Sequence, residues 1–244
     1  MRVKQIRNYS EYTTLLDNDE KEQEILRQIF SVNVTEFFRD AEFFNSFRRK
    51  VIPELKNKFK NKERAIRIWC AGCASGEEPY SVAMVLHEEI GQSIPFQIIA
   101  TDRNIEAINK AKLGRYYIRS LYKVSSDLLV KYFDLESSTQ AYWLSIKNKI
   151  RGYVNFSVGD IVIDTPPSDL DIVLCRNVMI YMSEEAHRKM FQAFYKSLNP
   201  GGYLVLGQSE MILGESRTLF ESVLPKERVY VKSSDSTIAH QVPS

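Results

Sequence analysis

The feature that most constrains the fold is the segment 65–80, where a short apolar run leads into a glycine-containing turn and an amphipathic stretch. Its first five residues predict a strand, because β-branched and aromatic side chains favour extended backbone. Gly72 and Gly76 lie in the turn, and helical periodicity begins at Glu77. Pro79 then falls in the first helical turn, where its missing N–H removes no hydrogen bond. A strand, a tight turn and a helix N-terminus in this order predict the first βα unit of a doubly wound α/β domain.

The same unit predicts a ligand that contains a ribose. The next predicted strand, 96–101, is followed by Asp102, and an acidic residue at this place can accept hydrogen bonds from both ribose hydroxyls. The spacing of Gly72 and Gly76 differs from the glycine pattern of dinucleotide-binding proteins and from that of phosphate-binding loops. Two glutamates at the helix start would repel a pyrophosphate and favour a cationic ligand. These residues alone leave two candidates open, S-adenosylmethionine (SAM) and a nucleotide.

Length and composition limit the class of protein. The 244 residues suffice for one full hydrophobic core and a small appendage. A net charge of +2 gives no indication of nucleic-acid binding. Three cysteines make no even disulfide framework and indicate a reducing, cytoplasmic compartment. We expect no signal peptide and no membrane insertion, because no apolar run of the sequence is long enough to span a bilayer.

Cys70 and Cys73 form a Cys-x-x-Cys pair. Zinc sites normally use four ligands, and the remaining candidates are Cys175 and three scattered histidines. We therefore expect no metal, and we interpret the cysteine pair as part of the packing around the turn. The histidines fall in two predicted helices and the C-terminal tail, so none is expected to act in catalysis.

Strands and helices alternate through most of the chain. Between Arg115 and Gly152 the alternation stops, and a helix near Ser125–Tyr132 and a strand near Tyr142–Ile146 predict a small antiparallel flap. The other predicted elements are helices over 77–90 (ending at Gly91), 104–113 (ending at Gly114) and 183–198, strands over 153–158, 171–175, 203–207 and 228–232, and a turn over 199–202.

The N-terminal part of the sequence predicts two helices, and its first thirty or so residues are too few to form a domain. One helix is expected near residues 20–30. Asp40 is placed to cap a second helix, in which apolar residues recur at helical spacing from Phe43 to Leu55. We interpret these apolar residues as core.

Polar residues gather where the predicted strands end. Residues 70–78, Asp102, Asp160, Arg176 and Asn177 each follow a strand. Because the carboxyl ends of parallel strands meet at one edge of a sheet, we expect these residues to form one ligand site. A single polar residue after a strand is usually a turn former, so the prediction depends on four strand ends converging.

Four motifs together resemble those of the CheR-type chemotaxis-receptor glutamate methyltransferases. In chain order they are NVTEFFR at 33–39, ASGEEPYS at 74–81, CRNVMIY at 175–181, and NPGG at 199–202 with GQSE at 207–210. Their order and separations fit the family, and the resemblance covers roughly Phe30 to Lys232.

The resemblance implies transfer of a methyl group from SAM to receptor glutamate side chains, which yields glutamyl methyl esters and S-adenosylhomocysteine. It implies an α/β, doubly wound, Rossmann-like methyltransferase fold with a helical lead-in (1–60), a methyltransferase domain (61–232) with an inserted flap at about 115–152, and a disordered tail (233–244). The implied partner is the cytoplasmic helical domain of a chemoreceptor, with no nucleic acid, and we expect a monomer.

By position, the resemblance also implies roles for single residues. Glu78 would contact the methionine part of the cofactor, Asp102 would hold the ribose hydroxyls, and Tyr181 would face the incoming glutamate. Asp160 and Ile161 would flank the adenine. The expected catalytic residues are Arg39 and Tyr181. The expected cofactor-binding residues are Asn33, Thr35, Arg39, Gly72, Glu78, Asp102, Asp160, Ile161, Arg176 and Asn177.

The chemistry of the implied reaction fits these roles. A glutamate near pH 7 is already ionised, so no general base is required. What remains is to desolvate the carboxylate and hold it in line with the methyl group. Arg39 can grip a carboxylate by two hydrogen bonds, and Tyr181 can add one more. Because charges neutralise in the transition state, Arg39 is expected to align the substrate more than to stabilise the transition state.

Two departures from the family pattern leave alternatives open. Family members usually have several tens of residues of helical domain before the first motif, whereas about thirty residues precede it here. The flap segment 136–140 contains no glycine, so tethering to a receptor tail peptide is not expected. The alternatives are a methyltransferase for another carboxylate or a small molecule, a SAM-binding module without turnover, and a nucleotide-linked dehydrogenase, which the Gly72–Gly76 spacing disfavours.

Overall fold

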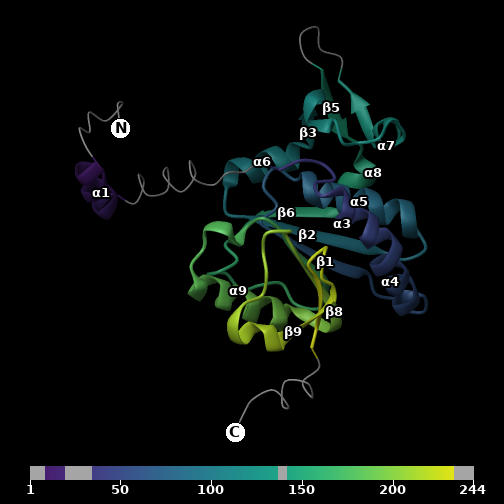
Figure 1. Cartoon of the computed structure of the whole chain (residues 1–244). Helices are drawn as coiled ribbons and strands as arrows, with labels where there is room; N and C mark the ends of the chain where they lie inside the picture. The colour runs from purple at the N-terminus through teal and green to yellow at the C-terminus, as the bar shows by residue number, and fades with distance from the viewer. Residues whose placement is uncertain (1–8, 20–34, 137–141, 234–244) are drawn as a thin grey trace. The chain divides into compact units, whose positions relative to one another are not determined.

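The computed structural model describes residues 9–19, 35–136 and 142–233 (Figure 1). The chain divides into two compact units, Met1–Val34 and Thr35–Ser244. The described part of the first unit contains the helix α1 (Tyr9–Asn18), which the sequence analysis did not predict. The helix expected near residues 20–30 and the tail expected after residue 233 lie outside the described residues.

The second unit is built on a seven-stranded sheet with the strand order β6-β2-β1-β7-β8-β10-β9 (Figure 1). Neighbouring strands from β6 to β8 are parallel, whereas β10 is antiparallel to both of its neighbours. The order reverses between β1 and β7, which is where doubly wound folds bind ligands. The predicted doubly wound α/β fold is therefore confirmed. The strands are β1 (Ile66–Ala71), β2 (Phe96–Asp102), β6 (Val154–Val158), β7 (Leu170–Cys175), β8 (Leu198–Leu206), β9 (Phe220–Leu224) and β10 (Val229–Lys232).

Helices cover both faces of this sheet (Figure 1). One face, which includes Ile68 and Ile98, packs against apolar side chains of the helices that precede and follow β1 in the chain. The other face, which includes Trp69, packs against α9, where the rings of Trp69 and Phe194 meet edge to face at 5.7 Å. The helical segments are α3 (Ala41–Ser46), the π-helix η2 (Phe47–Val51), α4 (Ile52–Phe59), α5 (Glu77–Ile90), α6 (Ile105–Leu113), α9 (Glu184–Ser197), and the 3₁₀-helices η4 (Met179–Tyr181) and η5 (Gly214–Leu219).

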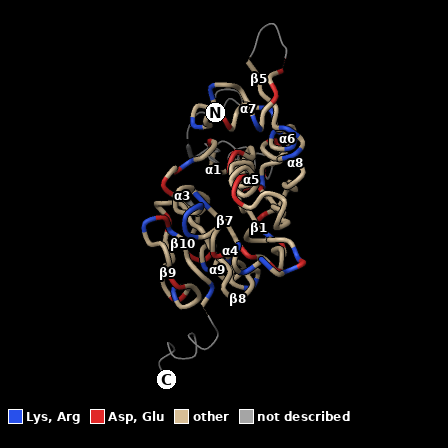
Figure 2. The backbone as a smooth tube through the Cα atoms, turned by 90° about the vertical axis from the view of Figure 1, so that its right-hand side faces the viewer, with Lys and Arg blue, Asp and Glu red and all other residues tan. Residues whose placement is uncertain are grey.

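The predicted flap is present as a three-stranded antiparallel sheet with the order β3-β5-β4. Figures 1 and 2 both show β5 at one end of the unit, away from β8 and β9. Phe37 fastens the flap to the rest of the unit, because its ring contacts Tyr116 and Phe133 edge to face at 4.8 and 5.7 Å. The flap contains β3 (Arg115–Tyr117), η3 (Ile118–Leu121), α7 (Ser126–Tyr132), β4 (Phe133–Leu135), β5 (Trp143–Ile146) and α8 (Asn148–Arg151).

Three details differ from the sequence predictions. Asp40 precedes α3 in a left-handed conformation but makes no capping hydrogen bond with its side chain, so the predicted cap is wrong. The turn expected at 199–202 lies inside β8, because Leu198 already pairs with Leu170 and a register shift accommodates the glycines. Strand β9 was missed, since a single buried residue in five gives no alternating apolar pattern.

No helix within the described parts of the chain combines the length and the apolar character needed to cross a bilayer.

Candidate active site

The turn after β1 lies at the point where the strand order reverses. The backbone N–H groups of Gly72 and Cys73 donate to the carbonyl of Thr101 at 2.8 and 2.9 Å, which joins the ends of β1 and β2. Gly72 has φ +79°, and a Cβ on it would lie 2.4 Å from Cγ2 of Val178. Glycine is therefore required for the loops after β1 and β7 to touch, and its predicted contact with a cofactor stays a prediction.

Asp102 ends β2 as a buried carboxylate that its own neighbourhood holds in place. Its Oδ2 accepts the N–H of Ala74 at 2.8 Å, and its Oδ1 accepts the N–H of Asn104 at 2.9 Å. Each carboxylate oxygen can accept about two hydrogen bonds. The side chain thus has a fixed orientation and acceptor capacity for a pair of hydroxyls, which fits a ribose.

Two glutamates begin helix α5, of which Glu77 is buried and Glu78 is half-buried. The hydroxyl of Ser75 donates to the Glu77 carboxylate at 2.8 Å, while burial raises the pKa of Glu77 to about 7. Burial also raises the pKa of Glu78, against the opposing effect of Arg176, whose Nη1 lies 2.9 Å from Glu78 Oε2. The first turn of α5 therefore places two carboxyl groups side by side in the chain, both largely shielded from solvent.

The raised pKa of Glu77 predicts a pH-dependent stability. Between its ordinary value of 4.5 and about 7, the folded state keeps a proton that the unfolded chain releases, so the free energy of unfolding falls as pH rises through this window. Glu77→Gln is expected to remove about 2 kcal/mol of the decline between pH 5 and 7 in urea titrations. Glu184→Gln is the control, because Glu184 also begins a helix, α9, but is exposed. Equal pH slopes for Glu77→Gln and the wild type would contradict the prediction.

Arg176 connects three segments at the carboxyl end of the sheet. Its side chain is 2% exposed. Besides binding Glu78, it donates through Nη2 to Asp40 Oδ2 at 2.5 Å and to the carbonyl of Arg39 at 3.2 Å. The guanidinium also lies 4.6 Å from the centre of the Phe43 ring. Asp40, predicted as a helix cap, therefore serves instead as an ion-pair partner of Arg176.

The described part of the first motif, residues 35–39, is hydrogen-bonded both to the start of α5 and to the flap. The N–H of Phe38 donates to Ser81 Oγ at 3.0 Å, and that hydroxyl donates to the carbonyl of Glu77 at 2.7 Å. Glu36 binds Tyr122 and Lys123, at the end of η3. Thr35 and Arg39 are both half-buried in this segment. Asn33 lies outside the described residues.

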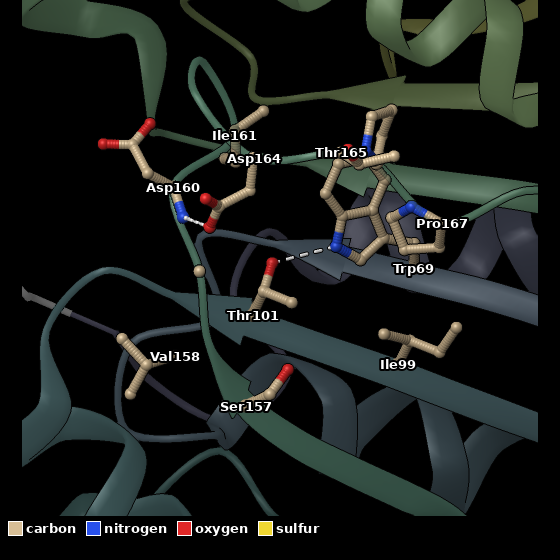
Figure 3. A pocket seen from close by; sticks show the side chains of 12 residues that line it. Trp69, Ile99, Thr101, Ser157, Val158, Asp160, Ile161, Asp164, Thr165 and Pro167 are labelled. Atoms are coloured by element: carbon tan, nitrogen blue, oxygen red, sulfur yellow. Dashed lines mark hydrogen bonds between the residues drawn. The ribbon is translucent and has the colours of Figure 1, made fainter.

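A pocket of about 190 Å³ lies beside the ends of β1, β2 and β6 (Figure 3). Asp160 and Ile161, predicted to flank an adenine, both line it. Trp69 Nε1 donates to Thr101 Oγ1 at 2.9 Å across its wall, and Asp164 Oδ2 accepts the N–H of Asp160 at 2.8 Å (Figure 3). Apolar side chains and proline rings with a few oriented polar groups suit a flat heteroaromatic ring. The lining residues are Trp69, Ile99, Thr101, Ser157, Val158, Gly159, Asp160, Ile161, Asp164, Thr165, Pro166 and Pro167.

The predicted residues divide between this pocket and the adjoining strand ends. Asp102 directly follows the pocket residue Thr101, whereas Glu78 and Arg176 form the ion pair near β1 and β7. Trp69, Thr101 and Asp164 were not predicted from the sequence. A usable signal existed for Trp69 and Thr101, because both stand near the ends of predicted strands.

Two predicted residues follow β7 in the third motif. Asn177 adopts the left-handed conformation, with φ +61°. Tyr181 is the last residue of η4, and its side chain lies outside what the structure describes. Its predicted contact with the substrate remains a prediction.

The three cysteines are buried, and burial raises the pKa of each thiol well above its ordinary value. A buried thiol with a raised pKa is a poor nucleophile and a poor metal ligand. Among the described residues, no three His, Cys, Asp or Glu side chains are arranged to hold a metal ion.

Comparison with known proteins gives consistent matches over most of the chain. The family model described as "CheR methyltransferase, SAM binding domain" matches residues 33–229. A chemotaxis protein methyltransferase of Borreliella burgdorferi is 32% identical over 92% of this chain and 81% of its own length. A chemotaxis protein methyltransferase of Listeria monocytogenes is 32% identical over 76% of this chain and 68% of its own. Chemotaxis protein methyltransferase 1 of Pseudomonas aeruginosa is 35% identical over 78% and 70%.

Proposed function

This chain belongs to the CheR methyltransferase family, and we propose that it transfers methyl groups from SAM to glutamate carboxylates of a chemoreceptor's cytoplasmic helical domain. The observation that supports this most is that the four motifs of the resemblance are joined by hydrogen bonds. Arg176 of the third motif binds Glu78 of the second and the carbonyl of Arg39 in the first. Glu210 of the fourth motif binds the backbone of Asn177 in the third.

The strand ends offer groups that suit each part of SAM. Asp102 would accept the ribose hydroxyls, and the pocket at Asp160 and Ile161 would enclose the adenine. Glu78 Oε2 is held by Arg176, which orients the carboxylate to accept the ammonium of the methionine part. When bound, SAM supplies an activated methyl group on a positively charged sulfur.

The remaining residues have to position the acceptor. Arg39 would grip the substrate carboxylate by a forked pair of hydrogen bonds, and Tyr181 would add one more. The backbone on both sides of Arg39 is already fixed, by Phe38 N–H on Ser81 and by Arg176 on the Arg39 carbonyl. Because the acceptor is ionised near neutral pH, these residues need to orient and desolvate it, and no group has to remove a proton.

The proposed methyl acceptor also determines the proposed partner, a chemoreceptor, and the proposed compartment, the cytoplasm. An acceptor on a receptor's cytoplasmic domain places the enzyme in the cytoplasm, where buried free thiols such as Cys70 remain reduced. We propose that it acts as a monomer, which light scattering after size-exclusion chromatography would test.

Asp102→Asn is expected to weaken SAM binding about ten- to hundred-fold, since charge-assisted hydrogen bonds contribute about 1.5–3 kcal/mol. An asparagine would also turn its NH₂ toward one of the two N–H groups that the carboxylate now binds. Isothermal titration with SAM and S-adenosylhomocysteine measures the change, and Asp127→Asn, in the first turn of α7, is the control. Unchanged affinity would remove Asp102 from the cofactor site.

The function itself is tested by incubating the chain with methyl-labelled SAM and the cytoplasmic fragment of a chemoreceptor encoded in the same genome. Label on the receptor that mild alkali releases as methanol is expected, because carboxyl methyl esters hydrolyse readily. Receptor variants with the modified glutamates replaced by alanine should lose the label. Transfer to small carboxylates but not to receptors would favour the alternative acceptor. SAM binding without any transfer would favour a binding module.

A further inference from the structure

One motif residue has no part in the proposed chemistry, yet it makes the densest set of polar contacts at the site. Glu210 is 5% exposed. Its Oε2 accepts the N–H of Gly207 at 2.7 Å and of Asn177 at 2.8 Å. Its Oε1 accepts the N–H groups of Val178 and Met179, both at 2.8 Å. One buried carboxylate thus accepts four backbone hydrogen bonds.

The four donors belong to two different loops. Gly207 follows β8, whereas Asn177, Val178 and Met179 follow β7 and lead into η4. Hydrogen bonds to an ionised carboxylate are stronger than those between neutral groups. The carboxylate therefore fastens the loop after β7 to the end of β8.

Two features of the backbone accompany the contact between the Glu210 carboxylate and the two loops. Asn177 has φ +61°, the left-handed conformation that asparagine tolerates better than most residues other than glycine, and its N–H is bound there by Glu210 Oε2. A Cβ on Gly207 would lie 2.7 Å from Glu210 Oε2 and 2.8 Å from Asn177 N. The glycine leaves the space that the carboxylate and the loop occupy.

The loop that is held this way contains the residues expected to meet cofactor and substrate. Arg176 directly precedes the clamped segment, Asn177 is within it, and Tyr181 ends the short helix that it starts. We propose that Glu210 is a positioning residue for methyl transfer, which fixes the backbone of residues 177–179 so that Asn177 and Tyr181 meet their ligands in one geometry. This inference rests on the proposed function and adds a residue to it.

The alternative is a purely structural carboxylate, and the chain offers a matched control for it. Asp171 is fully buried in β7, at the end of the strand opposite to the one that Arg176 follows. It too accepts several hydrogen bonds, from both Nη groups of Arg64, the N–H of Arg67 and Nδ2 of Asn199. Asp171→Asn therefore removes a comparable buried charge far from the proposed site.

Glu210→Gln keeps the size of the side chain but places an NH₂ group against two of the four N–H donors. We expect kcat for receptor methylation to fall about a hundred-fold, with a smaller change in the dissociation constant of SAM. Asp171→Asn should lower the melting temperature comparably and leave kcat within about twofold of wild type. A Glu210→Gln enzyme with a lowered melting temperature but wild-type kcat and SAM affinity would overturn the proposal.

Gly207→Ala provides an independent variant, because it disturbs the same contact and leaves the carboxylate charged. It should reproduce the loss of kcat, and it decides the question if Glu210→Gln does not fold. Hydrogen exchange without any substrate separates this inference from the proposed function. Amides of residues 177–179 should exchange at least ten-fold faster in Glu210→Gln and Gly207→Ala, but not in Asp171→Asn. Unchanged exchange in both site variants would refute the clamp, whatever the enzyme methylates.

Discussion

Replacing Arg176 by alanine is expected to lower the free energy of unfolding by about 3–5 kcal/mol, the usual cost of removing one partner of a buried ion pair. The guanidinium is 2% exposed and neutralises two carboxylates, Glu78 and Asp40. Without it, the half-buried carboxylate of Glu78 would lose its ion-pair partner. Denaturation in guanidinium chloride at pH 7 measures the loss, and titration with SAM should show weaker binding of the folded variant.

The cause assigned to this loss can be checked by pH and by a control. Burial already raises the pKa of Glu78, so lowering the pH protonates its carboxyl and should reduce the difference between Arg176→Ala and wild type. Lys189→Ala removes an exposed ion pair with Glu185 and should cost less than about 1 kcal/mol. A difference that stays constant from pH 7 to pH 5 would mean that lost packing on Phe43, rather than the uncompensated charge, explains the effect.

Arg39→Ala is expected to reduce kcat for receptor methylation about 10²- to 10³-fold, because a misaligned acceptor loses the advantage of a positioned one. SAM affinity should change less than about five-fold. The backbone around Arg39 is held by contacts that the substitution leaves intact, from Phe38 to Ser81 and from Arg176 to the Arg39 carbonyl. Turnover assays and calorimetry on the same preparation measure both quantities.

Two further variants define the role of the Arg39 side chain. Arg39→Lys keeps the charge and loses the fork, so its kcat should lie between those of wild type and Arg39→Ala. Arg49→Ala removes an exposed arginine from η2 and should leave kcat unchanged. If Arg39→Ala weakened SAM binding by the same factor as it lowered kcat, Arg39 would belong to the cofactor site instead.

The predictions that the structure confirms rest on local patterns. Helix α5 begins and ends where the sequence predicts, between the glycine turn and Gly91. Gly114 likewise ends α6 in a left-handed conformation. The flap was predicted because the alternation of strands and helices stops at Arg115. Periodicity, caps and breakers act over a few residues, so a sequence displays them directly.

At the candidate site, the errors and omissions concern contacts between distant segments. Asp40 has the residue type and position of a helix cap, but its carboxylate binds Arg176, 136 residues further along the chain. Glu210 was seen as part of a motif, and nothing in the sequence indicates that it binds the loop after β7. Trp69 was predicted as a strand residue, whereas its indole also forms a wall of the pocket with Thr101.

The sequence by itself determined the α/β class, the alternation of the main strands and helices, and the motifs whose residues were expected at the site, because these depend on local patterning and on motifs that retain their spacing. Only the tertiary structure decided which carboxylate binds which donor: Asp40 and Glu78 on Arg176, Asp102 on Ala74 and Asn104, Glu210 on the loop after β7. A carboxylate is a strong acceptor wherever it stands. Its partner is set by which loops the sheet brings together, and burial then makes that pairing obligatory.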